Sequence, residues 1–417
     1  MTLIKTSILS AVATGLRILV GLITNKIIAI YVGPSGIAFL GQFQNFLQAA
    51  MSISVGTIES GVVKYTSQYN SDKEEMYSYW STAIRFSLIV TVLLSILIVF
   101  FHSYLSLFLF QNTTYKSIFL IFALNLFLFV LNSFLFAVLN GLKEIMTLLP
   151  LQILGAVISL VSTGFLIYHY NLYGALLGMA INQSLIFGAT VWFLRQKSWF
   201  KWSHFTQNTD KKHLSNVYKF ALMGITSAIV GPTTLILIRN HIGETLSWTE
   251  AGYWQGVWRI SEIYLMVIIS TLSIYFLPKL SELQYHPEKL RIEILQGYKL
   301  IIPITLVIAV GIYLFRDFII LLIFTKDFLP MSELFAFQLI GDVIKMAGWL
   351  LGYLMLAKAM TKMYIFSEIV FNGSFFILSY FLINHFGLTG VTYAFMYNSL
   401  LSLLFLLFIF RGVLFGR

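Results

Sequence analysis

Nine ionisable side chains fall inside long apolar stretches of this sequence, and they are its candidates for chemistry. A charged side chain at the centre of a lipid bilayer costs at least about 2.5 kcal/mol unless it faces protein or water, so each of the nine requires a reason. The four carboxylates among them are the only candidates for a group that couples to an ion. The nine are Arg17, Lys26, Glu59, Arg85, Arg259, Glu262, Asp342, Lys345 and Glu368.

Sequence spacing offers some of these charges a partner on the same helix. Arg259 and Glu262 are three residues apart, as are Asp342 and Lys345, so each pair could neutralise itself along its own helix. Glu368 has no such neighbour, and it is either protonated or paired with a charge from another helix. For these five residues a structural and a functional interpretation both stay open.

Three more charges differ in their distance from the ends of their apolar stretches. Arg17 lies near the middle of the membrane, where its side chain would have to reach far to meet water. Lys26 is nearer the end of the same stretch, and snorkelling to the membrane surface explains it equally well. Arg85 lies one turn inside its stretch, after Trp80, and is interpreted as an interfacial anchor. Arg17 is therefore the cation that most needs a polar surrounding.

Two stretches present a polar face if they form helices. At 100° per residue, the polar residues of 37–63 fall within about 40° of one line, and those of 249–277 fall within a slightly wider stripe. Such faces either join helices through hydrogen bonds or line a water-filled cleft, and formal charge within them favours the cleft. The residues are Gly41, Asn45, Gln48, Ser52 and Glu59 in the first stretch, and Gly252, Gln255, Arg259, Glu262, Ser270 and Ser273 in the second.

The composition shows which solvent these elements require. Of the 417 residues, 58% are hydrophobic and only 11% are charged, whereas a soluble domain carries roughly a quarter charged residues. A helix needs about 20 apolar residues to cross the hydrocarbon core, so the length allows about a dozen crossings with short connections. The expected fold class is an all-α membrane protein with about 12 transmembrane helices and no sizeable soluble domain.

Hydropathy and loop residues place twelve candidate spans and give them an orientation. Eighteen basic residues fall in loops on the side of the N-terminus, against four on the other side, namely Lys116, Arg239, Arg316 and Lys326. The positive-inside rule then places both termini in the cytoplasm. The predicted spans are 8–31, 37–63, 81–103, 117–140, 147–170, 174–194, 215–239, 249–277, 300–322, 331–356, 362–384 and 389–410.

The sequence also matches itself at an offset of 216 residues. A repeat of this kind indicates two six-helix bundles in the same orientation, as in transporters that rock two halves about a central site. The predicted division is 1–194 for the N-terminal bundle, 195–214 for a polar cytoplasmic linker and 215–417 for the C-terminal bundle. The matching residues are Gly15 with Gly231, Gly36 with Gly252, Gly174 with Gly390, and Asn182 with Asn398.

Several classes of protein are excluded or disfavoured. The net charge of +10 comes mostly from short loops between apolar stretches, which is typical of cytoplasmic membrane loops and not of nucleic-acid binding. The sequence has no cysteine, so disulfides and thiolate metal sites are excluded, and its seven histidines lack metal-ligand spacing. No G-x-x-x-x-G-K-[ST] loop is present, so ATP does not drive the chain directly. No metal and no cofactor are expected.

Six stretches are similar to a known family of membrane proteins. They are GPSGIAFLGQFQ (33–44), SGVVKYTSQY (60–69), AGYWQGVWRISE (251–262), YFLPKLSEL (275–283), FRDFIILLIF (315–324) and FAFQLIGDVIKMAGWLLGYLMLAKA (335–359). The chain resembles the Wzx polysaccharide flippases over essentially its whole length. Within that family it is most similar to the branch of the lipid III flippase and the O-antigen translocases.

The resemblance implies a fold, an activity and a location. The fold is that of the multidrug/oligosaccharidyl-lipid/polysaccharide exporter superfamily, with two six-helix bundles around a central cavity. The activity is that of a flippase rather than an enzyme. The flippase would move an undecaprenyl-pyrophosphate-linked oligosaccharide, of the O-antigen or enterobacterial common antigen type, to the periplasmic leaflet of the inner membrane by alternating access. A polysaccharide polymerase and a chain-length regulator are candidate partners.

Candidate site residues follow from this implied substrate. Arg17, Lys26 and Arg259 would hold the pyrophosphate, since a guanidinium can bind two oxygens at once. Asn45, Gln48 and Gln255 would hydrogen-bond the sugars. Ion coupling or counter-charge would come from Glu262, Asp342, Lys345 and Glu368.

Departures from the family leave part of this assignment open. Arg17 and Lys26 fall where that branch has basic residues, and Glu262 falls at an acidic position. Glu59, Arg85 and Arg259 fall where the branch is not expected to be charged. These three are either specific to the substrate of this chain or incidental.

Three alternative functions compete with the flippase. A cation-coupled multidrug exporter of the same superfamily should expose carboxylates with few bases, whereas the predicted spans hold five bases and four acids. Transport of lipid II itself is a closer variant. A membrane-embedded polysaccharide polymerase or glycosyltransferase usually needs an extramembrane loop or a carboxylate constellation, and the predicted periplasmic loops are short.

Overall fold

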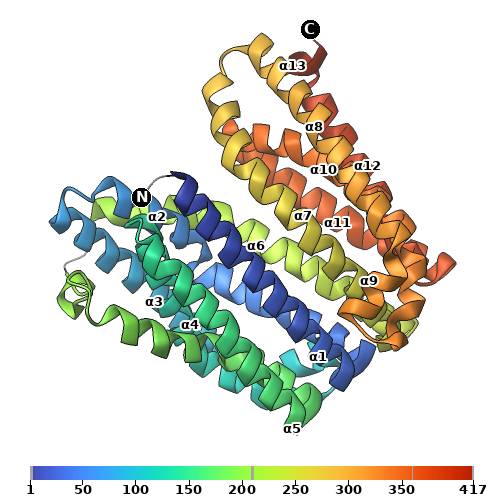
Figure 1. Cartoon of the computed structure of the whole chain (residues 1–417), viewed down its shortest axis with the longest axis horizontal. Coiled ribbons are helices and arrows are strands. Elements are labelled where there is room, and N and C mark those ends of the chain that lie inside the picture. Colours follow the sequence, from blue (N-terminus) through green and yellow to red (C-terminus); the bar gives the residue numbers. More distant parts are fainter. Residues whose placement is uncertain (1–2, 208–210, 359, 416–417) are drawn as a thin grey trace. The chain divides into compact units, whose positions relative to one another are not determined.

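Long α-helices account for almost the whole chain in the computed structural model of this protein (Figure 1). The structure describes residues 3–207, 211–358 and 360–415. Within those ranges there is no β-strand, and the helices are joined by short turns. The expected all-α fold class is confirmed.

Contacts divide the helices into two units. The N-terminal unit comprises Met1–Val32 and Phe39–Pro232, and the C-terminal unit comprises Gly33–Ala38 and Thr233–Arg417. The first helix contributes to both units, because its residues 33–38 pack with the second. The predicted division at 195–214 stays a prediction, although the contacts place the boundary later in the chain.

The N-terminal unit is built from five long helices and short connecting turns. In this unit α4 packs against both α3 and α5. A π-helical turn, η1 (Ser52–Gly56), joins the first two helices. The helices are α1 (Leu3–Met51), α2 (Thr57–Gln68), α3 (Lys73–Phe110), α4 (Lys116–Gly141) and α5 (Ile145–Leu194), with the 3-10 turns η2 (Thr113–Tyr115) and η3 (Trp202–His204).

The C-terminal unit contains the remaining helices, and α6 crosses the boundary between the units. Within it α10 packs against α7, α8 and α12, and α11 packs against α12. The helices are α6 (Lys211–Thr245), α7 (Trp248–Leu283), α8 (Pro287–Leu314), α9 (Arg316–Ile323), α10 (Phe335–Ala357), α11 (Thr361–Phe386), α12 (Thr389–Ile409) and α13 (Arg411–Phe415), with the 3-10 segment η4 (Lys326–Leu334).

Eight helical stretches of the described chain are long and apolar enough to cross a membrane. Two of them, Val12–Gln68 with 57 residues and Ile145–Leu194 with 50 residues, are each long enough for two crossings. Each contains one non-helical residue, at Gly33 (φ 71°) and Asn171 (φ 46°), between two predicted spans. The helices α6 and α7 are not among the eight, and the total of twelve spans stays a prediction.

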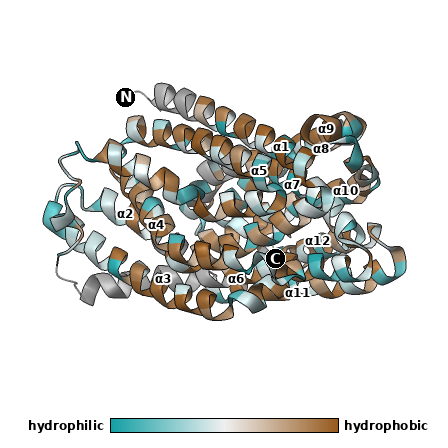
Figure 2. Cartoon of the chain, turned by 90° about the horizontal axis from the view of Figure 1, so that it is seen from below, coloured by the Kyte–Doolittle hydropathy of each residue, from teal (hydrophilic) through white to brown (hydrophobic). Residues whose placement is uncertain are grey.

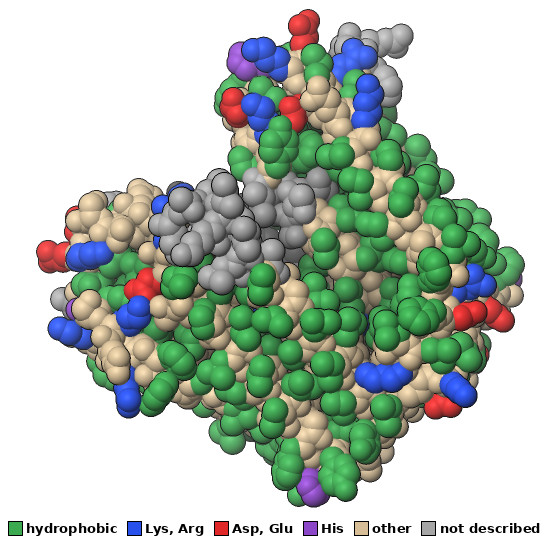
Figure 3. All heavy atoms as spheres, in the orientation of Figure 1, with side chains coloured by type: hydrophobic (Ala, Val, Ile, Leu, Met, Phe, Trp, Pro, Cys, Tyr) green, Lys and Arg blue, Asp and Glu red, His purple; other side chains and the backbone are tan. Residues whose placement is uncertain are grey.

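The helix surfaces are apolar in the way that a bilayer requires. Figure 2 shows hydrophobic residues along most of the length of the helices, with hydrophilic ones mainly at helix ends and connections. On the face drawn in Figure 3, hydrophobic side chains cover most of the area and charged ones stand mostly toward its edges. Phe100 and Leu124 are 77% and 78% exposed. Such exposure costs about 1.5–3 kcal/mol per large side chain in water, so hydrocarbon is the solvent of these helices.

The ninth predicted span, 300–322, is wrong as a single helix. The chain bends at Phe315, so α8 ends at Leu314 and the short α9 follows. The helix α8 begins at Pro287, well before residue 300. Its first half is charged but amphipathic, and the apolar face of this half is buried. Hydropathy alone excludes this half from a span. The residues of α8 that are buried on this face are Leu290, Ile294, Gly297 and Ile301.

The backbone supports the internal repeat at its two most similar points. Asn171 (φ 46°, ψ −126°) and Gly387 (φ 62°, ψ −147°) lie 216 residues apart, and each separates two long helices with the same left-handed turn. Three residues later, Gly174 and Gly390 bring two helices into close contact. A Cβ atom at Gly174 would lie 1.9 Å from the carbonyl oxygen of Leu166, eight residues earlier. A Cβ atom at Gly390 would lie 2.2 Å from the equivalent oxygen, that of Leu382.

The aligned asparagines also make equivalent contacts. Asn182 donates a hydrogen bond from Nδ2 to Ser159 Oγ. In the second unit, Ser374 Oγ donates to Asn398 Oδ1. Asn182 therefore links the two parts of α5 on either side of Asn171, and Asn398 links α12 to α11. Together with the turns at Asn171 and Gly387, these contacts support a duplication of one arrangement of helices.

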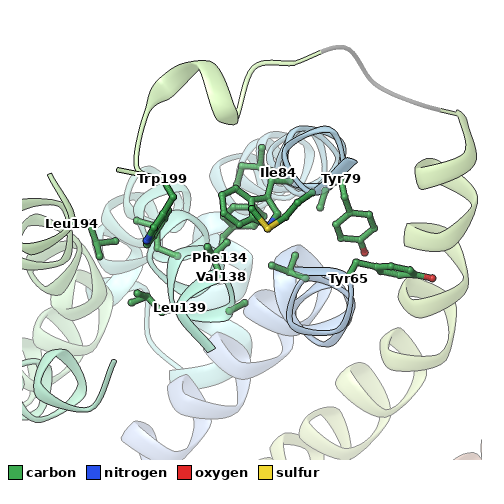
Figure 4. Packing of buried hydrophobic residues seen from close by; sticks show 14 of the residues in the cluster. Tyr65, Tyr79, Ile84, Phe134, Val138, Leu139, Leu194 and Trp199 are labelled. Carbon is green, nitrogen blue, oxygen red and sulfur yellow. The ribbon is translucent and has the colours of Figure 1, made fainter. Parts of the chain in front are cut away.

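The described part of the predicted linker packs on the N-terminal unit. Trp199 joins a buried cluster that includes Trp80, and Phe205 stacks on Trp80 with ring centroids 5.7 Å apart. Figure 4 shows Trp199 beside Leu194 and near Phe134 of α4. The segment is polar on average, but its aromatic residues attach it to the N-terminal unit. Residues 208–210 lie outside the described chain.

Polar contacts reinforce this attachment at both ends of the segment. Glu144 accepts hydrogen bonds from Lys197 Nζ at 2.6 Å and from Trp199 Nε1 at 2.7 Å. Further along, Arg85 Nη2 donates to the carbonyl oxygen of Thr206 at 2.9 Å. The His204 ring stacks on Tyr77 with centroids 3.8 Å apart. Arg85, predicted as an interfacial anchor, therefore also secures residues 195–207.

Neutralising Glu144 is expected to destabilise the protein at neutral pH and not at low pH. Burial raises the pKa of this carboxyl, but the hydrogen bonds from Lys197 and Trp199 and the charge of Lys197 outweigh burial, so the pKa lies below its usual value. Its stabilising effect is complete above the unfolded-state pKa and is lost as the pH falls through the folded-state pKa. Glu144→Gln should therefore cost about 1 kcal/mol at pH 7.

The measurement is the thermal unfolding midpoint of the purified protein at several pH values. Glu74→Gln, at an exposed position of α3, is the matched control and should leave the midpoint unchanged. An equal loss for Glu144→Gln at pH 7 and at pH 3 would contradict the assigned role of the carboxylate.

Candidate functional site

A buried carboxylate lies where α7 meets α10 in the C-terminal unit. Asp342 is 0% exposed, and its Oδ2 accepts hydrogen bonds from Ser261 Oγ at 2.7 Å and from Tyr264 OH at 2.8 Å. The two donors are three residues apart on α7 and so share one face of that helix. Gln338, one turn before Asp342 on α10, is also fully buried and lies against the same carboxylate.

Lys345 is held by aromatic rings instead of by its predicted partner. Its Nζ lies 5.4 Å from the ring centroid of Trp258 and 5.3 Å from that of Phe395. Such cation–π contacts stabilise an ammonium by roughly 0.5–2 kcal/mol. No direct ion pair of the described residues joins Asp342 to Lys345, so of the two possibilities left open for this pair the structure shows a longer-range attraction and not a salt bridge.

Lys345 nevertheless acts on two acids. Its charge attracts the carboxylates of Asp342, on its own helix, and of Glu368, on α11. Glu368 is half-buried and accepts a hydrogen bond from Asn372 Nδ2 at 3.3 Å. The sequence left open whether Glu368 meets a charge from another helix, and Lys345 is that charge.

The second predicted pair is confirmed. Arg259 Nη1 lies 3.7 Å from Glu262 Oε2, and both side chains are partly exposed. Trp258 Nε1 donates to the other oxygen, Oε1, at 3.0 Å. Glu262 is therefore held by two neighbours on α7 while it remains open to the surroundings.

One buried cation was missed by the sequence analysis. Arg239 is 1% exposed, its Nε donates to Gln255 Oε1 at 2.8 Å, and its guanidinium lies 5.6 Å from the Trp254 ring centroid. Its prediction as a loop residue is wrong because α6 continues to Thr245. The signal was the helical spacing of Ile238 and Ile242, both fully buried, which extends the apolar face beyond residue 239.

Four predicted site residues belong to the N-terminal unit. Arg17 is exposed, and its Nη2 donates to Thr14 Oγ1 at 3.2 Å. No carboxylate of the described chain forms an ion pair with it. Lys26 is half-buried, Asn45 is buried and Gln48 is exposed. Among the described residues Arg17 therefore has no acid to neutralise it, whereas Asn45 is mostly enclosed by protein.

The predicted polar line along 37–63 does not continue to Glu59. The π-helical turn η1 has more residues per turn than an α-helix, so it rotates the faces that follow. Glu59 lies against α4, where Ser133 hydrogen-bonds its carboxyl. On the matching stretch, the side chains of Ser270 and Ser273 lie outside the described residues. The partner of Glu59 is therefore on α4, and a π-helical turn lies between Glu59 and the candidate site residues of α1.

Removing the carboxylate of Asp342 is expected to destabilise the C-terminal unit strongly. Asp342→Ala leaves the hydroxyls of Ser261 and Tyr264 without their acceptor, at a cost of about 1–3 kcal/mol for each buried group. Asp342→Asn keeps an oxygen of the same shape and should lose less than half as much stability. The thermal unfolding midpoints of both variants provide the comparison. Equal losses would show that the charge, and not the acceptor, holds α7 to α10.

The family of this chain follows from a match that covers most of the polar residues just described. A family model described as "Polysaccharide biosynthesis protein" matches residues 45–333. The chain belongs to this family. The match contains Gln255, Arg259 and Glu262, whereas Arg17 and Asp342 lie outside it.

Curated relatives of this polysaccharide biosynthesis protein extend the similarity to nearly the whole chain. The lipid III flippases of Escherichia coli (strain K12) and Shigella flexneri are each 29% identical to it over 397 residues, which is 95% of this chain and 95% of each relative.

Solved structures show that this family member shares the transporter fold implied by the resemblance. An inward-facing multidrug resistance MATE family transporter of the MOP superfamily has a TM-score of 0.81 at 14% identity, over 95% of both chains. The lipid II flippase MurJ, in an inward closed conformation, has a TM-score of 0.76 at 18% identity, over 97% of this chain and 87% of its own. The expected superfamily fold is confirmed.

Proposed function

We propose that this chain is a flippase that moves a lipid-linked oligosaccharide from the cytoplasmic to the periplasmic leaflet of the bacterial inner membrane. The single observation that carries the proposal is the 29% identity to lipid III flippases over 95% of both chains. The membrane-compatible helix surfaces and the exposed guanidinium of Arg17 on α1 agree with it. The chain then acts as a transporter and catalyses no reaction.

The substrate explains why charge is needed inside the membrane. A pyrophosphate and its sugars lose many kcal/mol of hydration if they enter hydrocarbon, whereas a polyprenyl tail can remain in the lipid. A protein that offers cations and hydrogen-bond partners along the path replaces that hydration. Alternating access of two halves about the site would then carry the head group across.

The roles of single residues are part of this proposal. Arg17 is the first candidate for the pyrophosphate, because it is exposed and, among the described residues, hydrogen-bonds to the neutral Thr14 and to no acid. Lys26 and Arg259 would assist it, although Glu262 already faces Arg259. Gln48 is exposed and suits sugar recognition, and buried Asn45 would need to be uncovered first.

Arg239 changes the role proposed for Gln255. The Gln255 oxygen accepts a hydrogen bond from Arg239 Nε, so a sugar hydroxyl must displace that donor or bind the remaining amide nitrogen. We therefore assign Arg239 a positioning role for Gln255. Lys345, Asp342 and Glu368 form the proposed coupling group, because one cation attracts two acids there.

Finer features of the proposal concern the glycan, the partners and the orientation. The name of the curated relatives favours a substrate of the enterobacterial common antigen type over an O-antigen unit. A polysaccharide polymerase and a chain-length regulator are proposed partners. Both termini are proposed to be cytoplasmic, and removal of buried Arg239 from the loop residues leaves only Lys116, Arg316 and Lys326 on the opposite side.

Deletion of the gene tests the proposal. Loss of a flippase should cause an undecaprenyl-pyrophosphate-linked glycan to accumulate where an impermeant glycan-modifying enzyme, added to spheroplasts, cannot reach it. Re-expression of the chain should restore access. An unchanged pool of lipid-linked glycans, with normal glycan at the cell surface, would rule out this function, and altered drug sensitivity alone would favour a multidrug exporter.

A further inference from the structure

A recess of about 770 Å³ opens at the helix ends of the N-terminal unit. The end of α2, the last turn of α4, the α4–α5 turn and the first turn of α5 form its walls, and the segment that follows α5 closes one side. Neither Arg17 nor a charged residue of the C-terminal unit is among its lining residues. Its polar and apolar lining includes Ser67, Asn140, Lys143, Glu144, Met146 and Lys197.

The charges of the recess leave one ammonium without a counter-ion. Lys197 Nζ lies 2.6 Å from Glu144 Oε2, so these two groups neutralise each other. The second oxygen of Glu144 accepts from Trp199 Nε1 at 2.7 Å. Lys143 is exposed, and its ammonium has no hydrogen bond or ion pair within the described chain. The recess therefore carries a net positive charge even though a carboxylate lines it.

The level of the recess in the membrane points to a lipid as its ligand. It lies between the end of α4, at Gly141, and the start of α5, at Ile145. Helix ends at this position coincide with the level of lipid head groups. Met146 is 59% exposed and, with Ile145 and Val63 in the same lining, provides apolar surface beside the ammonium. A ligand with a phosphate at one end and a hydrocarbon chain at the other matches this combination.

We propose that this recess binds the phosphate of a membrane lipid. Lys143 supplies the unneutralised cation, and the exposed side chains of Ser67 and Asn140 supply further hydrogen-bond donors. Lys197 stays neutralised by Glu144, so the net charge of the recess comes from Lys143. Binding of a phospholipid there does not depend on flipping, whereas binding of a polyprenyl pyrophosphate rests on the proposed function.

Two lipids carry this chemistry in an inner membrane, an anionic phospholipid and a polyprenyl pyrophosphate. Both present phosphate oxygens next to a hydrocarbon chain. The phospholipid would occupy the recess as a permanent neighbour of the protein, whereas the polyprenyl pyrophosphate would use it as a first docking point. Direct competition between the two distinguishes them.

The test measures binding of phosphatidylglycerol to the delipidated, purified protein by native mass spectrometry. Lys143 has a φ of 59°, so Lys143→Gln and Lys143→Arg make the same demand on the backbone and differ in charge. Lys143→Gln should weaken binding about tenfold, as expected for loss of a charge-assisted hydrogen bond. Lys143→Arg should bind as the wild type does.

Controls keep the test decisive. Lys289→Gln removes an equally exposed charge from α8 and should leave binding unchanged. Asn140→Ala is a second variant in the recess that should weaken binding without removing charge. In one outcome, undecaprenyl pyrophosphate displaces phosphatidylglycerol from the wild type but not from Lys143→Gln. That result would identify the polyprenyl pyrophosphate as the lipid that binds the recess. Unchanged binding of both lipids to Lys143→Gln, or equal losses for Lys289→Gln, would overturn the proposal.

Discussion

Alanine in place of Gly174 or Gly390 is expected to reduce the amount of folded protein to a small fraction of the wild-type amount. The added Cβ would lie 1.9 Å from the oxygen of Leu166 in one variant and 2.2 Å from the oxygen of Leu382 in the other. Both atoms that would clash belong to the backbone, so the helices must separate to admit the methyl group. We expect a cost of roughly 3 kcal/mol or more at either site.

The two units provide matched tests of this expectation. Gly188→Ala in α5 and Gly373→Ala in α11 place a methyl group where no described atom lies within 4 Å, and these variants should accumulate normally. The measurements are the yield of monodisperse protein in detergent and its thermal midpoint. Normal yield for Gly174→Ala and Gly390→Ala would mean that the helices at these turns do not approach as closely as described.

Arg17→Ala is expected to abolish glycan export while the amount of protein in the membrane stays normal. Arg17 is exposed and hydrogen-bonds only to Thr14 among the described residues, so its removal disturbs no buried network. If Arg17 binds the pyrophosphate as proposed, loss of its guanidinium should weaken binding by about a hundredfold or more. Export is measured by restoration of surface glycan in the deletion strain.

Two further variants separate binding from packing at this position. Arg17→Lys keeps the charge but not the two parallel donors, and it should retain partial export. Thr14→Ala removes the hydrogen-bond partner of Arg17 and should leave export close to the wild-type level. Full complementation by Arg17→Ala would exclude this side chain from the transport site and move attention to Lys26.

The general architecture could be predicted because it depends on local properties of the sequence. Hydropathy over 20 residues identified the helices, and the breaks at Gly33 and Asn171 coincide with gaps between predicted spans. The repeat was predictable because Gly174 and Gly390 serve one steric purpose in both units. Hydropathy missed the start of α8 at Pro287. Charged residues on one face of a helix lower its mean hydropathy, but they do not end the helix.

The partners of the charged residues could not be predicted in the same way. Asp342 and Lys345 have the spacing of an ion pair, yet their contacts come from α7 and α12, which lie far away in sequence. Arg239 appeared to lie in a loop because its helix extends further than its most apolar part. The π-helical turn η1 rotates the helix faces that follow it, and the pattern of polar and apolar residues does not reveal this rotation. Glu59 was therefore predicted on the same face as Asn45 and Gln48.

Lys345 places one positive charge where three helices of the C-terminal unit interact with it. This side chain attracts one acid on α10 and another on α11, and it rests on an aromatic ring of α7. If either acid is protonated, as the proposed coupling role requires, the ammonium faces one negative charge instead of two. The protonation of Asp342 and that of Glu368 would therefore be linked through one cation that also contacts α7.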